Sequence, residues 1–457
     1  MNDQIQDASL SLSQWASGVT GTDVPDHVRH IVRTCVVDTI GVAVAGSGTG
    51  VAAMARQVAK QNACRGSADV LGSGTTASAA TAAFCNAAAA HALDFDDNCY
   101  AGFVHGSAVI VPAAIGMAQA LDAKGSDLVT AIAVGAECEY AVGAAAGMSL
   151  YQKGWWTTGL LGPIGAGVAA GHLLKLDADQ MRSCIGLAVA GAGGTKVCFG
   201  TDAKALLAAQ ASETGLRWAC LAAAGASGPS DPFSHPAGFA ALHNDGAFDH
   251  AACRDLGRAW RLQTPGIDIK KYPVCLSSPA AVDIVAELMA QESFAHDDVD
   301  EVLCDVPPVV AANLKYSSPV SAREAQFSME FAVAAVLCCG TLGLDQLHDE
   351  VLASDAVRAL MQRVRMVSGT MWDADRCKAA PEGASVLISR KDGRRYSGYR
   401  PHALGTAANP LPAADVRSKF LGCAEPSLGR KAAQNLLHSL ERLDADVPVR
   451  SLLNPAH

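Results

Sequence analysis

Residues 91–112, HALDFDDNCYAGFVHGSAVIVP, place three carboxylates and two imidazoles in one short segment between alanine-rich runs. The acids are Asp94, Asp96 and Asp97, and the imidazoles are His91 and His105. Only 18% of the chain is charged, so such a group is unusual, and carboxylates and histidines with perturbed pKa values commonly carry proton transfer. The alternative is a polar helix end with solvated acids, and the segment alone does not separate the two.

The runs that flank this segment predict a mainly α-helical protein. Residues 76–90 (TASAATAAFCNAAAA) and 107–121 are alanine-rich, and the same texture continues over 126–149. Half of the residues are apolar but only 5% are aromatic, which indicates a core of alanine and aliphatic side chains between closely packed helices. With 457 residues, the chain is long enough for two or more domains.

The character of the sequence changes near Pro265, where charged and β-branched residues become more frequent. VDEVLCDVPP (299–308) alternates like a strand, and SVLISRKDGRRYSG (385–398) resembles a β-hairpin with its turn at Asp392-Gly393. Beyond Pro401 the helical pattern returns, as in LGRKAAQNLLHSLERL (428–443). We therefore predict a large all-helical domain, residues 1–265 and 402–457, and a smaller α+β lid domain, residues 266–401.

Composition also limits the partners and the compartment. The formal charge of −10 and the pI near 5.7 argue against nucleic-acid binding, although a local group of cations can still bind a small anion. The 15 cysteines have no metal-ligand spacing, which predicts reduced thiols, no metal site and a cytoplasmic location. No uninterrupted apolar run reaches membrane-spanning length, so we expect no membrane partner.

Two segments supply candidate cations. Lys196 and Lys204 belong to the glycine-rich stretch 191–218, which enters a helix, and Lys270 and Lys271 precede the proline of IKKYP (269–273) at the predicted domain junction. A lysine in such a place can bind a substrate carboxylate, or act as a base if burial lowers its pKa. The alternatives are a solvated lysine in a first helical turn and an exposed cationic linker.

Two aromatic residues complete the set of candidates. Tyr316 lies in LKYSSP (314–319), and Trp156 lies in YQKGWWTTG (151–159), which we predict to be a loop. Tyr316 could equally be a packing side chain, and a tryptophan such as Trp156 more often fills core space than lines a ligand. The chain has no GxSxG, HExxH or GxxxxGK[ST] motif, so composition and spacing alone name no reaction.

Six segments, taken in order, resemble the MmgE/PrpD family over nearly the whole chain: HALDFDD (91–97), HGSAVIVPAA (105–114), GWWTTG (154–159), FGTDAK (199–204), IKKYP (269–273) and SPVSAREAQFSMEFAVAAVL (318–337). The resemblance implies a large helical domain with a smaller α+β lid, a homodimer, and a site in the cleft between the domains. It also implies a small polycarboxylate substrate and no cofactor.

The resemblance also assigns site positions residue by residue. Asp94 and His105 match the first segments, Lys204 matches the site lysine of the glycine loop, and Lys270 matches the lysine of K-x-[YF]-P. Tyr316 matches the site tyrosine ahead of the EAQFS helix. Trp156, Lys196 and Lys271 are expected to join Lys270 in substrate binding.

Three departures from the family pattern bear on the reaction. Trp156 stands where many relatives have the histidine of GFHPTG, Cys275 stands where the decarboxylase type has a histidine, and residues 206–209 replace LHAG. The missing imidazoles could have protonated a leaving hydroxyl or the carbanion left by decarboxylation. Their loss disfavours dehydration and decarboxylation.

We therefore predict an isomerase: a cofactor-independent epimerase of an imino- or amino-polycarboxylate of the iminodisuccinate type. Epimerisation needs a base on each face of the carbon and cations to spread the enolate charge, but no protonated leaving group. Lys204, Tyr316, His105 and Cys275 are the candidate acids and bases, and Asp94 is expected either to orient His105 or to raise the basicity of a neighbour. Cys275 can be a base only if nearby lysine charge stabilises its thiolate, and the alternative is that it is a small buried hydrophobic residue.

Other functions stay open from the sequence. A 2-methylcitrate-like dehydratase or a cis-aconitate-type decarboxylase would make the protein a lyase, and a polycarboxylate-binding protein without turnover is the alternative outside enzymes. The sequence also leaves open whether Asp96 and Asp97 belong to the site.

Overall fold

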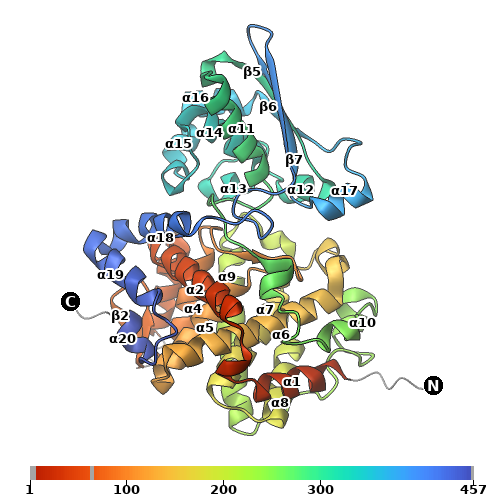
Figure 1. Ribbon diagram of the computed structural model, residues 1–457, viewed down its shortest axis with the longest axis vertical. Helices are drawn as coiled ribbons and strands as arrows, with labels where there is room; N and C mark the ends of the chain where they lie inside the picture. Colours follow the sequence, from red (N-terminus) through yellow and green to blue (C-terminus); the bar gives the residue numbers. More distant parts are fainter. Residues whose placement is uncertain (1–6, 62–65, 454–457) are drawn as a thin grey trace.

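Small residues let the helices of the larger part of the protein approach one another closely. The computed structural model describes residues 7–61 and 66–453 and has a helical body beneath a smaller part that carries a sheet (Figure 1). A Cβ added to Gly135 would lie only 2.5 Å from the carbonyl oxygen of Gly165, so this crossing of two central helices requires glycine. The mainly α fold with a small sheet in the C-terminal half confirms the predicted fold class.

The helical body is built around five helices that contact one another: α4 (Ala79–His91), α5 (Gly106–Leu121), α6 (Gly125–Gln152), α7 (Thr157–Leu173) and α9 (Asp202–Ala223). The surrounding elements are α1 (Ala8–Gly18), α2 (Asp26–Gly46), α3 (Gly50–Gln61), α8 (Ala178–Ala190), α10 (Phe239–Asn244), α18 (Ala413–Leu428), α19 (Arg430–Leu440), α20 (Val449–Leu453), and the short strands β1 (Ala68–Val70), β2 (Thr75–Ala77), β3 (Asn98–Cys99) and β4 (Ile267–Asp268). In Figure 1 the C-terminal helices α18 and α19 lie beside α2, so both ends of the described chain belong to the same body.

The smaller part has one sheet with the strand order β6-β5-β7-β8, in which only the β5–β6 pair is parallel. Helices α11 and α14 contact this sheet. The elements are α11 (Pro279–Glu292), β5 (Val299–Asp305), α12 (Pro308–Asn313), α13 (Ala322–Ala325), α14 (Met329–Cys339), α15 (Asp349–Ala353), α16 (Asp355–Met361), β6 (Val364–Val367), α17 (Ala374–Ala379), β7 (Ala384–Arg390) and β8 (Arg395–Arg400).

Most local predictions agree with these elements. Strand β5 ends before Pro307-Pro308, where the ladder would lose its N–H donors, and the predicted hairpin is β7–β8 with its turn at Asp392-Gly393. The predicted loop 151–159 was wrong at both ends, because α6 continues to Gln152 and α7 begins at Thr157.

The two largest hydrophobic cores of residues 7–61 and 66–453 correspond to the two parts. The larger core draws on residues between Ala8 and Leu262 and between Phe420 and Leu453, together with Phe327. The smaller core draws on residues between Tyr272 and Ala403. On this basis we propose the domain division 1–265 with 402–457, and 266–401, which stays a prediction.

Helix α6 is long and apolar enough to cross a membrane, but 94% of its most apolar window is buried inside the protein. This burial is typical of a central core helix. The cysteines of residues 7–61 and 66–453 are all free thiols.

Buried Glu139 in α6 provides a test of the core. Its side chain is inaccessible to solvent, neither carboxyl oxygen has a hydrogen-bond partner among the described residues, and burial raises its pKa to about 8. The folded pKa lies above the unfolded value, so ionisation of Glu139 costs the folded protein more than the unfolded chain. The unfolding free energy is therefore full below the unfolded pKa and falls as pH rises from the unfolded pKa through the folded pKa. Relative to Glu139→Gln, the wild type should lose about 4 kcal/mol of unfolding free energy between these two pKa values.

Urea unfolding of the two proteins at a series of pH values measures this difference. A difference that does not change with pH would contradict the buried, unpaired state of Glu139.

Candidate active site

The site begins where α4 ends. After His91 the chain turns sharply, and Asp94 has a φ of 49°, in the left-handed region that aspartate tolerates better than most residues. The backbone N–H of Asp94 donates to the carbonyl of His91, 3.3 Å away. This turn carries the Asp94 carboxylate to the boundary between the helical body and the smaller part.

Two lysines from distant segments meet at Asp94. Lys204, near the start of α9, donates to Asp94 Oδ1 at 2.7 Å, and Lys270 donates to the same oxygen at 3.0 Å and to the Asp94 carbonyl at 2.7 Å. The pairing of Asn98 with Asp268 in β3–β4 brings Lys270 beside the turn. Both lysines are at most 6% exposed, so neither is the solvated helix-end or linker lysine that was the alternative.

This ion group is costly to bury, which points to a function. Burial by itself would raise the pKa of Asp94, but Lys204 and Lys270 together hold it well below its usual range. Asp94 is therefore ionised at any ordinary pH. Because a buried ion pair often adds little net stability, its presence in a cavity favours a role in binding or catalysis.

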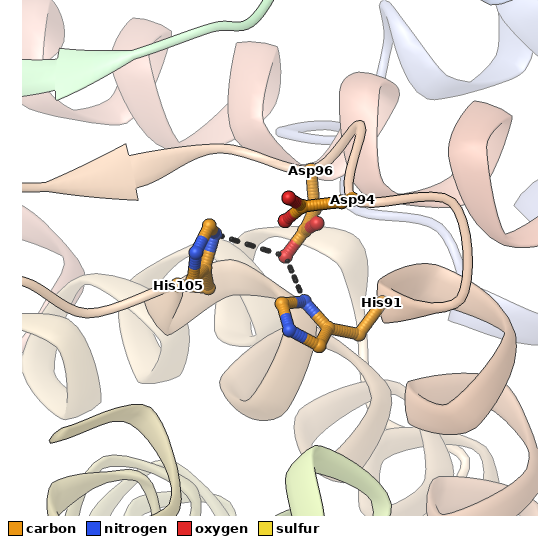
Figure 2. A group of neighbouring side chains, drawn as sticks. All are labelled: His91, Asp94, Asp96 and His105. Carbon is orange, nitrogen blue, oxygen red and sulfur yellow. Dashed lines mark hydrogen bonds and ion pairs between the residues drawn. The ribbon is translucent and has the colours of Figure 1, made fainter. Parts of the chain in front are cut away.

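The histidines are oriented by Asp96 (Figure 2). Asp96 Oδ2 lies 2.7 Å from His91 Nδ1 and 3.3 Å from His105 Nδ1, which is also 2.8 Å from the carbonyl oxygen of Asp97. Burial alone would raise the pKa of Asp96, but the two imidazoles hold it well below its usual range, and burial lowers the pKa of His91 to about 4. The prediction that Asp94 orients His105 was wrong, because the lysines occupy Asp94 and the adjacent acid does this work.

Asp97 has a different environment from its neighbours. Its Oδ1 lies 3.4 Å from the backbone nitrogen of Ser107, at the start of α5, and burial raises its pKa to about 7. Asp97 lines neither cavity, and its side chain contacts the start of α5 behind the site.

The four side chains in Figure 2 have donor atoms within 4.8 Å of one another and are of types that bind divalent cations. However, Asp94 already holds two ammonium groups, and these would repel a metal ion. The same charges attract an anion. We conclude that the group favours a negatively charged ligand over a cation.

An inner cavity of about 40 Å³ lies against this ion group, and an outer chamber of about 410 Å³ adjoins it. The two share Asp94, Lys204 and Phe327. The outer chamber continues between the start of α3 and Arg323 of α13, so it lies between the helical body and the smaller part.

Six of the nine predicted site residues line the inner cavity: Asp94, His105, Trp156, Lys204, Lys270 and Cys275. Lys196 stands just behind it, with Nζ 3.8 Å from the Tyr151 ring centre and 3.3 Å from Asn313 Oδ1. Tyr151 and Asn313 both line the cavity.

The structure does not bring Tyr316 or Lys271 to the cavity. The Tyr316 hydroxyl donates to the Phe199 carbonyl at 3.2 Å, and Gly200 makes room for the ring at a φ of 80°. Lys271 is 38% exposed and binds Asp283 at 3.2 Å. Neither residue lines the inner cavity or the outer chamber.

Cys275 lines the cavity but is not a thiolate. Burial raises its pKa to about 11, and the nearby charge of Lys270 does not overcome this effect. The condition for Cys275 as a base at neutral pH is therefore not met.

Sequence reasoning missed Glu382, Tyr151 and Asn313, which also line the inner cavity. Glu382 lies in the turn between α17 and β7, and burial raises its pKa to about 7. No local motif marks these residues, which come from three separate segments.

Residues 10–250 match the MmgE/PrpD N-terminal domain, and residues 272–445 match the MmgE/PrpD C-terminal domain. The chain belongs to the MmgE/PrpD family. Among curated proteins, the cis-aconitate decarboxylase of Mus musculus is 24% identical, with 99% of this chain and 94% of that protein covered. The enzymes of the same name from Homo sapiens and Aspergillus terreus strain NIH 2624 are also 24% identical, with 92% and 98% of this chain and 88% and 96% of those proteins covered.

The ion group of this MmgE/PrpD family member leads to a prediction about metals. Elemental analysis of the purified protein should find no stoichiometric transition metal, and a chelator should leave the melting temperature unchanged, because Lys204 and Lys270 already neutralise the acids. One bound metal per chain, lost in both His91→Ala and His105→Ala, would show instead that the imidazoles and acids hold a cation.

Proposed function

We propose that this protein is a lyase that decarboxylates a small unsaturated polycarboxylate of the cis-aconitate type. The main support is the pair of buried ammonium groups, Lys204 and Lys270, beside an enclosed polar cavity. The near-complete coverage of relatives named cis-aconitate decarboxylase agrees with this reaction class.

The lysines would act on the charge that develops during the reaction. When a carboxylate that is allylic to the double bond leaves as CO2, its bonding electrons form a new double bond. The electrons of the old double bond then move to the carbon next to a retained carboxylate, which becomes an enediolate. Lys204 and Lys270 would bind that carboxylate and stabilise its extra negative charge more strongly in the transition state than in the substrate.

The substrate needs more room than the inner cavity gives. About 40 Å³ holds only about three water molecules. A polycarboxylate that reaches Lys270 would therefore extend past Lys204 and Phe327 into the outer chamber, or the two parts of the protein would move apart to admit it.

A proton has to reach the enediolate carbon to complete the reaction. His105, Cys275 and Glu382 all line the inner cavity and carry exchangeable protons. Trp156 and Cys275 stand where two histidines were expected, so this cavity has fewer imidazole donors than the decarboxylase type has.

Adjacent lysines provide a matched test of this proposal. Wild-type protein should release CO2 from cis-aconitate, and Lys270→Met should lower kcat/KM by about 100-fold or more, because it removes one of the two charges that stabilise the enediolate. Lys271→Met should have a far smaller effect, because Lys271 binds Asp283 away from the cavity. Equal losses in the two variants, with melting temperatures unchanged, would argue against the assigned role of Lys270.

Epimerisation of an iminodisuccinate-type substrate is the second candidate. The observation that favours it is the presence of Trp156 and Cys275 at positions where a histidine was expected, both in the wall of the cavity. Proton NMR in D2O distinguishes the two reactions. Deuterium entering the α position of iminodisuccinate while its diastereomers interconvert, with no CO2 from cis-aconitate, would favour the epimerase.

A further inference from the structure

We propose that Glu382 is the general acid of this site and gives its proton to the substrate carbon. The inference rests on the proposed decarboxylation and names a catalytic group for it. The lysine-bound aspartate and Glu382 then have opposite roles in one cavity: one carboxyl group stays charged to hold the lysines, and the other stays neutral to supply a proton.

The position of Glu382 suits this role. It is 8% exposed, lies in the turn between α17 and β7, and lines the inner cavity together with Lys270 and Cys275. Its Oε2 atom has no hydrogen-bond partner among the described residues. An unpartnered buried oxygen is costly, and a bound substrate would remove that cost.

The protonation state of Glu382 also suits an acid. Burial raises its pKa to about 7, although a hydrogen bond with Ser277 and the charges of Lys270 and Lys196 oppose this rise. The charge of Asp268 adds to the rise, and Cys275, Tyr100 and Tyr151 also face the charge of Glu382. An acid whose pKa lies near the working pH is the most effective donor, because much of it is protonated and it still releases its proton readily.

The other proton carriers of the cavity are weaker candidates. The Cys275 thiol, with a pKa of about 11, holds its proton too tightly. His105 Nδ1 lies 2.8 Å from the Asp97 carbonyl oxygen, which can only accept, so this nitrogen carries the ring proton. This proton is already donated to a backbone carbonyl.

The proposed step balances as follows. The C–C bond to the departing carboxyl breaks and CO2 leaves, while the displaced electron pair forms the lysine-stabilised enediolate. The O–H bond of Glu382 then breaks as a C–H bond forms at the carbon next to the retained carboxylate. Glu382 is left as a carboxylate and takes a proton from water before the next turnover.

Glu382→Gln and Glu382→Asp test this role in the full-length protein. With cis-aconitate as substrate, wild-type kcat should fall as pH rises through about 7, because Glu382 loses its proton. Glu382→Gln should lower kcat by about 100-fold or more with little change in KM, and should lose this pH dependence. Glu382→Asp should keep the pH dependence with a smaller loss of kcat.

Glu139→Gln is the matched control, since it makes the same chemical change at a buried acid that lies outside both cavities. Its kcat and pH profile should equal those of the wild type. A Glu382→Gln protein that keeps wild-type kcat and pH dependence would overturn the role of Glu382 and leave the proposed decarboxylation intact.

Infrared difference spectra give a readout that needs no turnover. The band of protonated carboxyl groups that disappears as pH rises through about 7 should be larger in the wild type than in Glu382→Gln by the contribution of one carboxyl group, because Asp97, Asp268 and Glu137 titrate in the same range in both proteins. Equal bands in the two proteins would overturn the proposal whatever the substrate. A wild type that shows the larger band but releases no CO2 would instead overturn the proposed function.

Discussion

The carboxylate of Asp94 is the constraint on which the site depends. It accepts from Lys204 and Lys270, whose segments are far apart in the chain, and it lies in a turn fixed by the end of α4. Without this negative charge, two buried ammonium groups would repel each other across a small cavity. Burying all three charges costs free energy, and it occurs at a place where a negatively charged ligand can also bind the two lysines.

Three supports hold that turn in place from different sides. Gln326, between α13 and α14, donates to the Leu93 carbonyl at 2.6 Å. Lys419 of α18 donates to the Phe95 carbonyl at 2.7 Å and pairs with buried Asp38 of α2 at 2.7 Å. The β3–β4 pair holds its far end. The helical body, the smaller part and the C-terminal helices therefore all fix the same few residues, and small errors of placement in such a site are costly for catalysis.

The sequence predicted the fold well where the signal is local. Alanine-rich periodic runs, an alternating strand and an Asp-Gly turn each determine a short element by themselves. The site motifs predicted Asp94, Lys204 and Lys270 as site residues. They did not predict the direction in which each side chain of a motif points. Lys270 and Lys271 are neighbours just beyond β4, where the chain bends, and only Lys270 reaches Asp94.

Glu382 was missed for another reason. Its acid strength comes from burial by residues of several segments, and a glutamate in a turn is ordinarily a surface residue. A group kept this dry during the reaction has no ready contact with water from which to regain a proton. Each cycle would then include an interval in which the boundary between the two hydrophobic cores loosens, lets product out and wets the acid. The pace of the enzyme would thus depend on the movement of the whole smaller part as well as on the breaking of bonds.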